Sequence, residues 1–426
     1  MSLRRRVKAI QTFLSQRGDA LDFSTLPDPR DARGRRWPLG ALVSTAVLSL
    51  LLIAKSLRAA ERISKDLAEA QRKRGIKRRV PDSTLGDLLA ALSPNPIRQH
   101  LHRHVLEEHR RKALEPTVLP IRAISIDGKT VATVDAEVNP DCQKQNPKDQ
   151  PPYWLYRVAR ATLISSAAAV CVDQKAIPAE TNDMGVFADF FADLERTYRR
   201  AHLYELVFTD AGFTSEANAR QVDAAGKAYV MNLKKNQPEL LREAERILLP
   251  LAEKTPPEAE TAWEFDSSRG WIRRQLWRTR EMAQWGSWTH LRQVFWVRVL
   301  CREGKNGPES VLEDRFYVTN LPWGRLAPDV ILSLVRAHWR IENCCFGRMD
   351  IEWEEDHGRW VRRGNGLPVT SLLRVLAYNL LALLRASHLR SDDSHVAAWQ
   401  QLRDWVRDAL VWPILLDEPE AISAGP

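Results

Sequence analysis

The spacing of apolar positions changes near residue 115. Before that point apolar residues recur at three- and four-residue intervals, which predicts α-helices at 3–16, 39–57, 59–73 and 97–114. Beyond residue 119 the apolar runs become short, which predicts strands at 121–127, 155–164, 168–177, 203–209 and 228–233. Helical spacing returns between the third and fourth and between the fourth and fifth of these strands, at 184–199 and 215–225.

The resulting order β-β-β-α-β-α-β is typical of the ribonuclease-H-like fold and predicts an α/β class. A helix at 239–251 then precedes a second strand-rich region, 262–320, where alternating apolar and charged positions predict antiparallel sheet. Further helices are expected at 328–348, 367–384 and 396–410. We therefore predict a ribonuclease-H-like core with an all-β insertion.

Three domains are expected from these changes of pattern. Residues 1–115 form a helical N-terminal domain, residues 116–390 the ribonuclease-H-like domain with its insertion at about 258–322, and residues 391–426 a C-terminal helix and tail. The short helices and basic connections of the first domain fit a DNA-binding module, and they fit a plain helical bundle equally well. The last residues, 418–426, are expected to be disordered.

Composition narrows the class of partner. The formal net charge of +9 favours a polyanion, nucleic acid before membrane, with a basic protein that has no such partner as the alternative. The five cysteines form no CxxC pair, so neither a disulfide framework nor a zinc ribbon is indicated, and a reducing, cytoplasmic location is expected. The uncharged run 37–54 contains proline, glycine, serine and threonine, which predicts a buried helix rather than a membrane span.

The segment 121–133, IRAISIDGKTVAT, places an acidic residue beside a buried strand. Asp127 is expected at or near the end of that strand, and Gly128 allows the backbone an unusual turn directly after it. A buried carboxylate is costly unless something pairs with it. Taken alone the Asp-Gly pair fits a turn cap; a catalytic interpretation depends on Asp210 in LVFTDAGF and Glu342 in HWRIEN.

Glu342 is expected to project from the apolar face of the helix at 328–348. At 100° per residue one narrow stripe holds Ile331, Val335, His338, Glu342 and Cys345. An ionised glutamate there needs a cation, a hydrogen-bond network or a raised pKa, and a salt bridge to an arginine of another element is the alternative. Two aspartates and one inward glutamate are what a Mg²⁺ site requires.

Asp127, Asp210 and Glu342 are therefore the candidate catalytic and metal-binding residues, and their carboxyl carbons are expected within roughly 8 Å of one another. Competing candidates for the third acid follow closely in the sequence: Glu352, Glu354 and Glu355. They are expected in a charged, solvated stretch, whereas a metal ligand needs an inward position. Glu342 is therefore the preferred third acid.

The insertion is a candidate DNA-binding surface, because basic residues alternate there with tryptophans. A solvated face is expected to carry Arg273, Arg274, Arg278 and Arg280, which can hold phosphates while the tryptophans stack on bases. The alternative is that these tryptophans form the core of the sheet.

A second candidate surface follows the strand at 228–233. Its residues are Lys234, Lys235, Asn236 and Gln237. They are expected on the rim of the sheet that carries the aspartates, where ligands gather and where they can contact the DNA backbone; a polar loop that caps the next helix is the alternative. Arg340, beside Glu342, is a further candidate DNA-binding residue.

With these residues placed, the chain resembles the DDE transposases of bacterial insertion sequences, in a branch whose first acidic motif reads IDGKT. The other matching segments are DPRDARGR, VPDSTLGDLL, IPAETNDM, TDAGFTSEANARQVDAAGKAYVMNLKKNQPEL and HWRIEN, and together they cover nearly the whole chain. There are two departures. Phe346 and Gly347 stand where the branch usually carries His-Trp, and Val335, His338 and Met349 stand at the Tyr, Arg and Lys places of a related Tyr-Arg-Glu-Lys signature.

The resemblance implies an enzyme that cleaves DNA at the ends of an insertion sequence and transfers the freed 3′-OH to target DNA. Two Mg²⁺ ions, for which Mn²⁺ can substitute, would be bridged by Asp127, with Asp210 and Glu342 each completing the ligands of one ion. The implied partners are double-stranded DNA with terminal inverted repeats, target DNA, and a second copy of the chain in a homodimer on DNA, with no membrane. A catalytically inactive DNA-binding relic and a metal-dependent nuclease without strand transfer are the alternatives.

Overall fold

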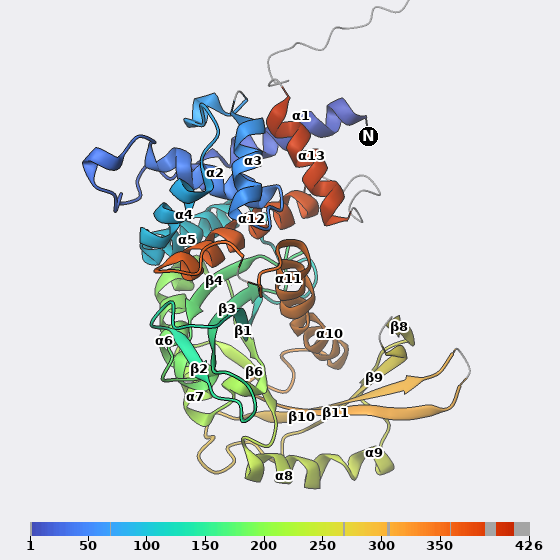
Figure 1. The fold of residues 1–426 in the computed structure, drawn as a ribbon. Coiled ribbons are helices and arrows are strands. Elements are labelled where there is room, and N and C mark those ends of the chain that lie inside the picture. Colours follow the sequence, from blue (N-terminus) through green and yellow to red (C-terminus); the bar gives the residue numbers. More distant parts are fainter. Residues whose placement is uncertain are drawn as a thin grey trace, which may run out of the picture. The chain divides into compact units, whose positions relative to one another are not determined.

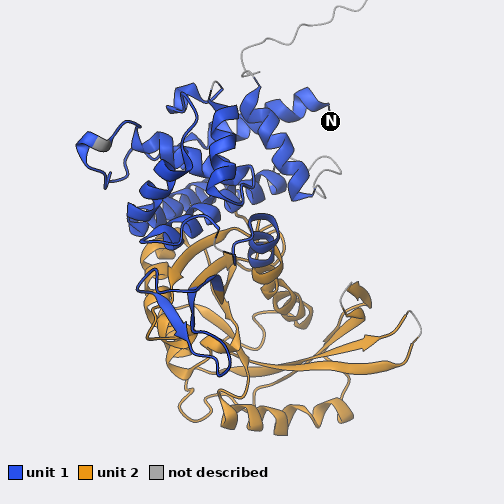
Figure 2. Ribbon diagram, in the orientation of Figure 1, with its two compact units in different colours: residues 1–113, 130–157, 345–426 blue, residues 114–129, 158–344 orange. Residues whose placement is uncertain are grey.

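The computed structural model describes residues 2–68, 70–266, 269–304, 307–357, 359–387 and 398–412. The chain folds into two compact units (Figure 2). Unit 1 comprises residues 1–113, 130–157 and 345–426, and unit 2 comprises residues 114–129 and 158–344. These units divide the chain at other points than the three expected domains, whose boundaries stay a prediction. The expected disordered tail, 418–426, lies outside the described residues.

Unit 1 is mainly helical. Its longer helices are α1 (Leu3–Gln16), α2 (Leu39–Leu51), α3 (Leu57–Leu67), α4 (Asp82–Ala91), α5 (Pro94–Arg110), α11 (Gly347–Trp353), α12 (Gly366–Ser387) and α13 (Trp399–Val411). Every residue of α2 except Gly40 is buried, as predicted for this uncharged run. The segment Gly366–Ala386 of α12 is long and apolar enough to cross a membrane by length and composition, but its apolar 18-residue window is wholly buried. Its apolar surface packs on α2, α4 and α5, so α12 is the core helix of unit 1.

Unit 2 is built on a mixed β-sheet (Figure 1). Its strands are β1 (Ala123–Val134), β3 (Tyr153–Leu163), β4 (Cys171–Ala176), β5 (Leu206–Thr209), β6 (Ala228–Leu233), β7 (Ala259–Glu260), β8 (Glu264–Asp266), β9 (Gly270–Thr279), β10 (Gln293–Arg302) and β11 (Glu309–Thr319). The strand order is β3-β1-β5-β6-β11-β10-β9, with β4 paired to β3 and both β7 and β8 paired to β9. Strands β1 and β3 continue into the residues of unit 1, where β3 also pairs with β2 (Cys142–Gln145).

The first part of this sheet has the predicted connectivity. Strands β1, β5 and β6 are parallel neighbours, and parallel neighbours need a crossover connection, usually a helix. Helices α6 (Asp183–Tyr198) and α7 (Glu216–Ala224) supply these connections. Apart from the short β2 between β1 and β3, the chain order β1-β3-β4-α6-β5-α7-β6 is the expected β-β-β-α-β-α-β, which confirms the α/β class and the ribonuclease-H-like core.

The all-β insertion continues the same sheet. After α8 (Pro238–Leu248) and α9 (Leu251–Lys254), strands β7 to β11 follow, and β11 pairs antiparallel with β6. Trp277 and Trp296 are buried, and their rings stack with centroids 4.6 Å apart. Exposed tryptophan faces are covered by the chain's own guanidinium groups, for example Trp263 by Arg302 at 4.1 Å. These tryptophans therefore belong to the packing of the sheet, which was the alternative to their stacking on DNA bases.

Two expectations about local structure are wrong. Strand β1 does not end at Asp127 but continues through Gly128 to Val134, and Gly128 has no positive φ. The β-branched residues of TVATV, which follow the glycine, favour extended backbone and explain the continuation. The single helix expected at 328–348 is instead α10 (Pro328–His338), a π-helical turn (Ile341–Phe346) and the start of α11.

Candidate active site

The two candidate aspartates lie side by side on the sheet. Strands β1 and β5 are parallel, and Ile126 is the register partner of Thr209. Asp127 and Asp210 are the next residues of these two chain segments, and the backbone of Asp210 is still extended. Since neighbouring strands lie about 4.8 Å apart, the sheet itself brings the two carboxylates to adjacent positions.

Glu342 lies on the π-helical turn that follows α10. The predicted stripe is observed: Ile331, Val335, His338 and Cys345 are buried, and Glu342 is half-buried among them. Ile331 and Val335 share one core with Phe208 of β5, which holds α10 on the sheet. Within the described ranges Glu342 forms no ion pair, so the salt-bridge alternative is not met.

The three carboxyl groups repel one another. Burial and the charge of Asp210 raise the pKa of Asp127 to about 8, with smaller contributions from Glu342 and Asp183, although the Gly128 N–H donates to Asp127 Oδ1 at 2.7 Å and opposes the rise. The pKa of Glu342 is also raised, first by burial and then by Asp210. The raised pKa values of Asp127 and Glu342 show that these carboxylates lack compensating positive charge, which a bound cation would supply.

The donor set fits a hard divalent cation, because carboxylate oxygens are the ligands that Mg²⁺ and Mn²⁺ prefer. The side chains are not gathered into a finished coordination shell, however. In the part of the chain that the structure describes, no three His, Cys, Asp or Glu side chains form a cluster ready to hold a metal ion. The separation of about 8 Å between carboxyl carbons stays a prediction, as do the metal-binding roles of Asp127, Asp210 and Glu342.

Asp183 is a fourth acid at this site that the sequence analysis did not select. It is the first residue of α6, whose N-cap Asn182 accepts a hydrogen bond from the Gly185 N–H. A Cβ placed on Gly212 would lie 3.3 Å from Asp183 Oδ2, so this carboxylate lies against the turn after Asp210. The signal in the sequence was the segment IPAETNDM, which contributed to the resemblance but to no site.

Lys234 lies at the site, as expected for the rim of the sheet. Its Nζ is 3.7 Å from Asp210 Oδ1, and its side chain is 59% exposed, which leaves the charge accessible to a ligand. Asn236 has a different role, because its amide donates to the carbonyl oxygens of Ala211 and Thr214. Gln237 also donates to Thr214. These amides therefore brace the turn after Asp210, while Lys235 is exposed and DNA contact by all four residues stays a prediction.

Substitutions of Lys234 and of Asn236 are therefore expected to have different effects, the first on DNA binding and the second on stability. Lys234→Ala is expected to weaken DNA binding and to reduce the slope of log affinity against log salt by about one unit, with thermal stability unchanged. Asn236→Ala is expected to cost about 0.5–1.5 kcal/mol of stability, because two hydrogen bonds to the turn are lost while Ala211 O keeps the Thr214 N–H and Thr214 O keeps Gln237 as donors. Binding titrations at several salt concentrations and thermal melts measure both, with the exposed Lys254→Ala as a charge-matched control. A loss of stability in Lys234→Ala with normal DNA binding would contradict the assignment.

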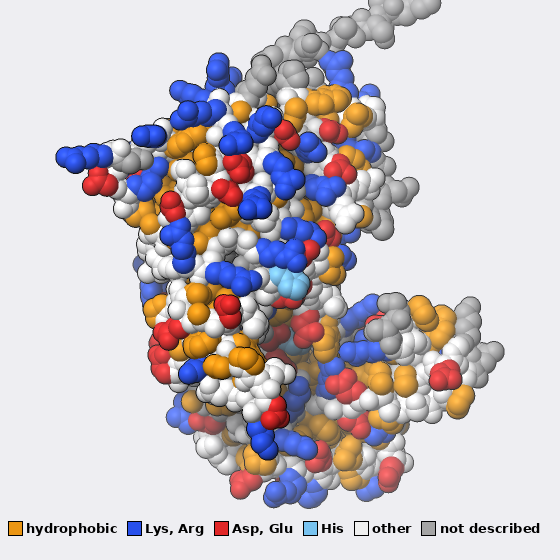
Figure 3. Space-filling model, in the orientation of Figure 1, with side chains coloured by type: hydrophobic (Ala, Val, Ile, Leu, Met, Phe, Trp, Pro, Cys, Tyr) orange, Lys and Arg blue, Asp and Glu red, His pale blue; other side chains and the backbone are white. Residues whose placement is uncertain are grey.

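The insertion arginines do not form the expected solvated face. Arg278 is buried and donates to Glu258, Arg274 pairs with Glu264, and Arg273 pairs with Glu309 at 3.1 Å. Only Arg280 among the four is exposed. Both acidic and basic side chains accordingly lie on the visible face of the β9–β11 region (Figure 3). The expected solvated face is wrong, since acidic partners come from β8, from β11 and from Glu258 just before β7. DNA contact by Arg273, Arg274 and Arg278 stays a prediction.

The Arg340 side chain forms hydrogen bonds within unit 2. Its NH1 donates to the carbonyl oxygens of Ile164 and Ser166 at 2.6 and 2.7 Å, and its NH2 donates to that of Ala167. The guanidinium thereby links the turn between β3 and β4 to the chain segment between α10 and the π-helical turn. These carbonyls do not neutralise the charge, so contact between Arg340 and DNA stays a prediction.

The competing acids lie in unit 1 and have partners there. Glu355 is fully buried and accepts from Arg374 at 3.1 Å and from Ser371 at 3.2 Å. Glu352 is also buried, and Glu354 pairs with Lys55 at 2.7 Å. The expectation that this stretch is solvated is wrong for Glu352 and Glu355, because α11 and α12 enclose them. Asp127 and Asp210 belong to unit 2, as does Glu342.

A cavity of about 660 Å³ opens beside Glu342 within unit 2. Its wall includes Arg269, Trp339, Arg340, Glu342 and Asn343. The Arg269 guanidinium lies over the Trp339 ring, 5.6 Å from its centroid, and its charge opposes the rise in the Glu342 pKa. The charged side chains of the wall are four arginines, Arg269, Arg274, Arg336 and Arg340, and three carboxylates, Glu264, Asp266 and Glu342. The small excess of positive charge suits a ligand that carries phosphates.

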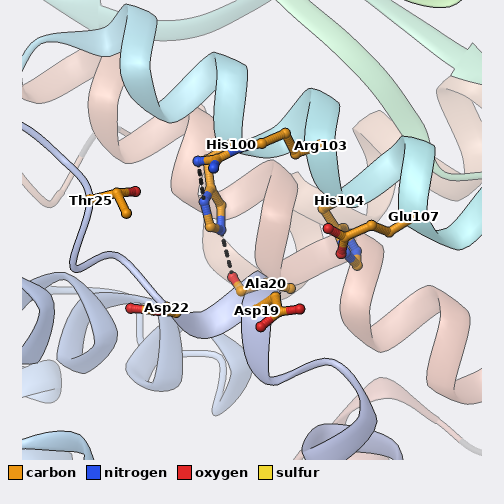
Figure 4. Close-up of a pocket in the computed structure, with 8 residues that line it drawn as sticks. All are labelled: Asp19, Ala20, Asp22, Thr25, His100, Arg103, His104 and Glu107. Atoms are coloured by element: carbon orange, nitrogen blue, oxygen red, sulfur yellow. Dashed lines mark hydrogen bonds between the residues drawn. The ribbon is translucent and has the colours of Figure 1, made fainter.

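A second cavity, of about 220 Å³, lies in unit 1 (Figure 4). His100 Nε2 donates to the Ala20 carbonyl at 2.9 Å, so Nδ1 is left to accept from Arg103. Both ring nitrogens are thus used, and His100 holds two segments of unit 1 together. Burial lowers the pKa of His104 to about 3, which keeps that ring neutral. These contacts fit a packed helical interior better than a catalytic site.

Comparison with known proteins gives a consistent family. Residues 119–380 match the family model described as "Transposase DDE domain". Two proteins of Escherichia coli (strain K12) are each 25% identical over 185 residues, namely "Putative protein YbfL" and "H repeat-associated putative transposase YhhI". Each alignment covers 42% of this chain and 47% of the relative, so the chain spans about half the length of these curated relatives.

Among solved structures, the piggyBac transposase synaptic complex with hairpin DNA, determined by cryo-EM, is similar over 96% of this chain and 80% of that chain. The sequence identity is 10% and the TM-score 0.44, a likeness too low to support an argument about function.

Proposed function

The chain belongs to the family of transposase DDE domains, and from this premise we propose that it cleaves DNA at the ends of a mobile element and joins the freed 3′ ends to target DNA. The observation that supports the proposal most strongly is the adjacency of Asp127 and Asp210 after paired positions of β1 and β5, together with the pKa values of Asp127 and Glu342, which burial and the charge of Asp210 raise. Asp127, Asp210 and Glu342 are the proposed catalytic residues, and DNA is the proposed substrate.

The proposed chemistry needs divalent cations, and these three residues would hold them. Bound Mg²⁺ would supply an activated water or 3′-OH as nucleophile and stabilise the leaving oxygen. The chain itself supplies rigidity: Asp127 and Asp210 are set by the register of β1 and β5, and Glu342 by the packing of α10 on that sheet. Two ions and the ability of Mn²⁺ to replace Mg²⁺ are part of the proposal.

Positive groups near the carboxylates would place the DNA backbone. Lys234 lies beside Asp210, and Arg269 lies in the wall of the cavity beside Glu342. Both are accessible positions at which a phosphate could replace an intramolecular contact. A DNA-binding protein without catalysis would have no need for buried carboxyl groups with raised pKa values, as Asp127 and Glu342 have, whereas a metal-dependent nuclease would share this site. The homodimer on DNA and the cytoplasmic location remain parts of the proposal.

The test is Mg²⁺-dependent cleavage and joining of DNA that carries the sequences flanking the gene, by the purified full chain. Asp127→Asn and Asp210→Asn are each expected to abolish both reactions. Asp189→Asn, which removes an exposed carboxylate from α6, is the control and should retain them. Cleavage that persists in both site variants would refute the assignment of the residues, and cleavage without joining would identify a nuclease.

A further inference from the structure

His338, the last residue of α10, is fixed to both strands that lead to the aspartates. Its Nδ1 lies 2.7 Å from Ser125 Oγ of β1. Its ring stacks on Phe208 of β5, with 4.3 Å between centroids and 16° between planes. Ser125 and Phe208 are themselves register partners. Ser125 and Phe208 thus form one rung of the sheet, meaning one pair of register partners on neighbouring strands. The imidazole, only 5% exposed, contacts both residues of this rung.

The distance along the sheet from the contacts of His338 to the aspartates agrees with the distance along the helix from His338 to Glu342. Asp127 and Asp210 follow Ser125 and Phe208 by two residues, which in a strand returns to the same face after about 6.6 Å. Glu342 follows His338 by four residues, which in a helix returns to the same side after about 6 Å. The hydrogen bond from Asn343 N–H to the Trp339 carbonyl, 2.9 Å, carries the helical path across this step.

We infer that His338 is a positioning residue, which sets Glu342 level with Asp127 and Asp210 by locking α10 to the rung formed by Ser125 and Phe208. The inference rests on the proposed function, because it assigns His338 a role in assembling the proposed metal site. His338 does not touch the metal or the DNA in this role. It acts through Glu342, as partners behind a ligand do when they fix its orientation.

A histidine that only fills the core would affect stability and nothing else, so the test separates the two effects. Ser125→Ala removes the hydroxyl partner, and His338→Phe keeps a stacking ring but removes the hydrogen bond. Ser165→Ala is a matched control, because Ser165 is equally buried and its Oγ also bonds to β1, accepting from Ala123 N–H at 3.1 Å. That contact lies at the start of β1, four residues before Asp127.

The measurement is calorimetric titration of the full chain with MnCl₂ in the absence of DNA, together with thermal melts. Ser125→Ala and His338→Phe are each expected to weaken Mn²⁺ binding about tenfold or more, as loss of a partner behind a ligand does. The double variant should be little worse than either single one, since both remove the same contact. Ser165→Ala should bind Mn²⁺ as wild type does, whatever its melting temperature.

Wild-type Mn²⁺ affinity in both Ser125→Ala and His338→Phe would overturn the inference, and so would an equal loss of affinity in Ser165→Ala. Asp127→Asn distinguishes this failure from failure of the proposed function. If Asp127→Asn loses Mn²⁺ binding while the Ser125 and His338 variants keep it, only the positioning role is wrong. If Asp127→Asn binds Mn²⁺ as wild type does, the metal site itself is refuted, and the positioning role falls with it.

Discussion

Glu342→Gln is expected to reduce Mg²⁺-dependent DNA cleavage by at least about a thousandfold, as loss of one member of a catalytic set does, and to leave thermal stability undiminished. The physical reason for the second part is that Glu342 has no ion-pair partner within the described residues, while burial and Asp210 disfavour its charge. Replacing the carboxylate by a neutral amide therefore removes a repulsion in the metal-free protein. Cleavage assays and thermal melts on the same preparations measure both parts.

Glu355→Gln should show the opposite pattern and is the matched control. Its carboxylate is fully buried against Arg374, whose side chain is 3% exposed. Removing one charge of a buried ion pair typically costs about 3–5 kcal/mol, because the remaining buried charge loses that partner. We expect Glu355→Gln to melt at a clearly lower temperature but to retain cleavage at temperatures where it is folded. Loss of cleavage in folded Glu355→Gln, with Glu342→Gln active, would make Glu355 the third acid instead.

These two glutamates also show where reasoning from the sequence succeeds and where it fails. Helical periodicity alone placed Glu342 on the stripe of Ile331 and Val335, because residues three and four apart share a face in any helix. The burial of Glu355 could not be read in this way. Its enclosure depends on Arg374, nineteen positions later on α12, and no local pattern reports a pairing between two elements.

The same limit, that a local pattern does not report pairing between elements, explains the wrong expectation for the insertion arginines. Alternation predicted its strands correctly, but the expected solvated face ignored the cross-strand partners of the arginines. Arg273 of β9 meets Glu309 of β11, and Arg278 of β9 meets Glu258, just before β7. Strand register decides such pairs, and register is set by the whole sheet rather than by one strand. Likewise, the rung shared by Ser125 and Phe208 joins residues 83 positions apart and became visible only once β1 and β5 were paired.

Asp127→Asn is expected to stabilise the metal-free protein at neutral pH. The pKa of Asp127 is raised from its ordinary value of 3.8 to about 8 in the folded state, so between these values the folded chain binds a proton that the unfolded chain has lost. Wild-type stability must then fall as pH rises from about 4 to about 8. The asparagine variant does not titrate and escapes this loss. With about 1.4 kcal/mol for each unit of pKa difference, and allowing for partial exposure of the side chain, the gain at pH 7.5 is on the order of 1–3 kcal/mol.

Thermal melts in EDTA between pH 5 and pH 8 measure this difference, which should widen as the pH rises and be smallest at pH 5. Adding Mg²⁺ should then raise the melting temperature of wild type, because a ligand that binds only the folded state stabilises it, and should leave Asp127→Asn unaffected. Asp189→Asn, exposed on α6, should track wild type at every pH. An Asp127→Asn variant that is less stable than wild type at pH 8 in EDTA would mean that this carboxylate is held by favourable contacts within the chain, which outweigh its burial and its repulsion by Asp210 and Glu342.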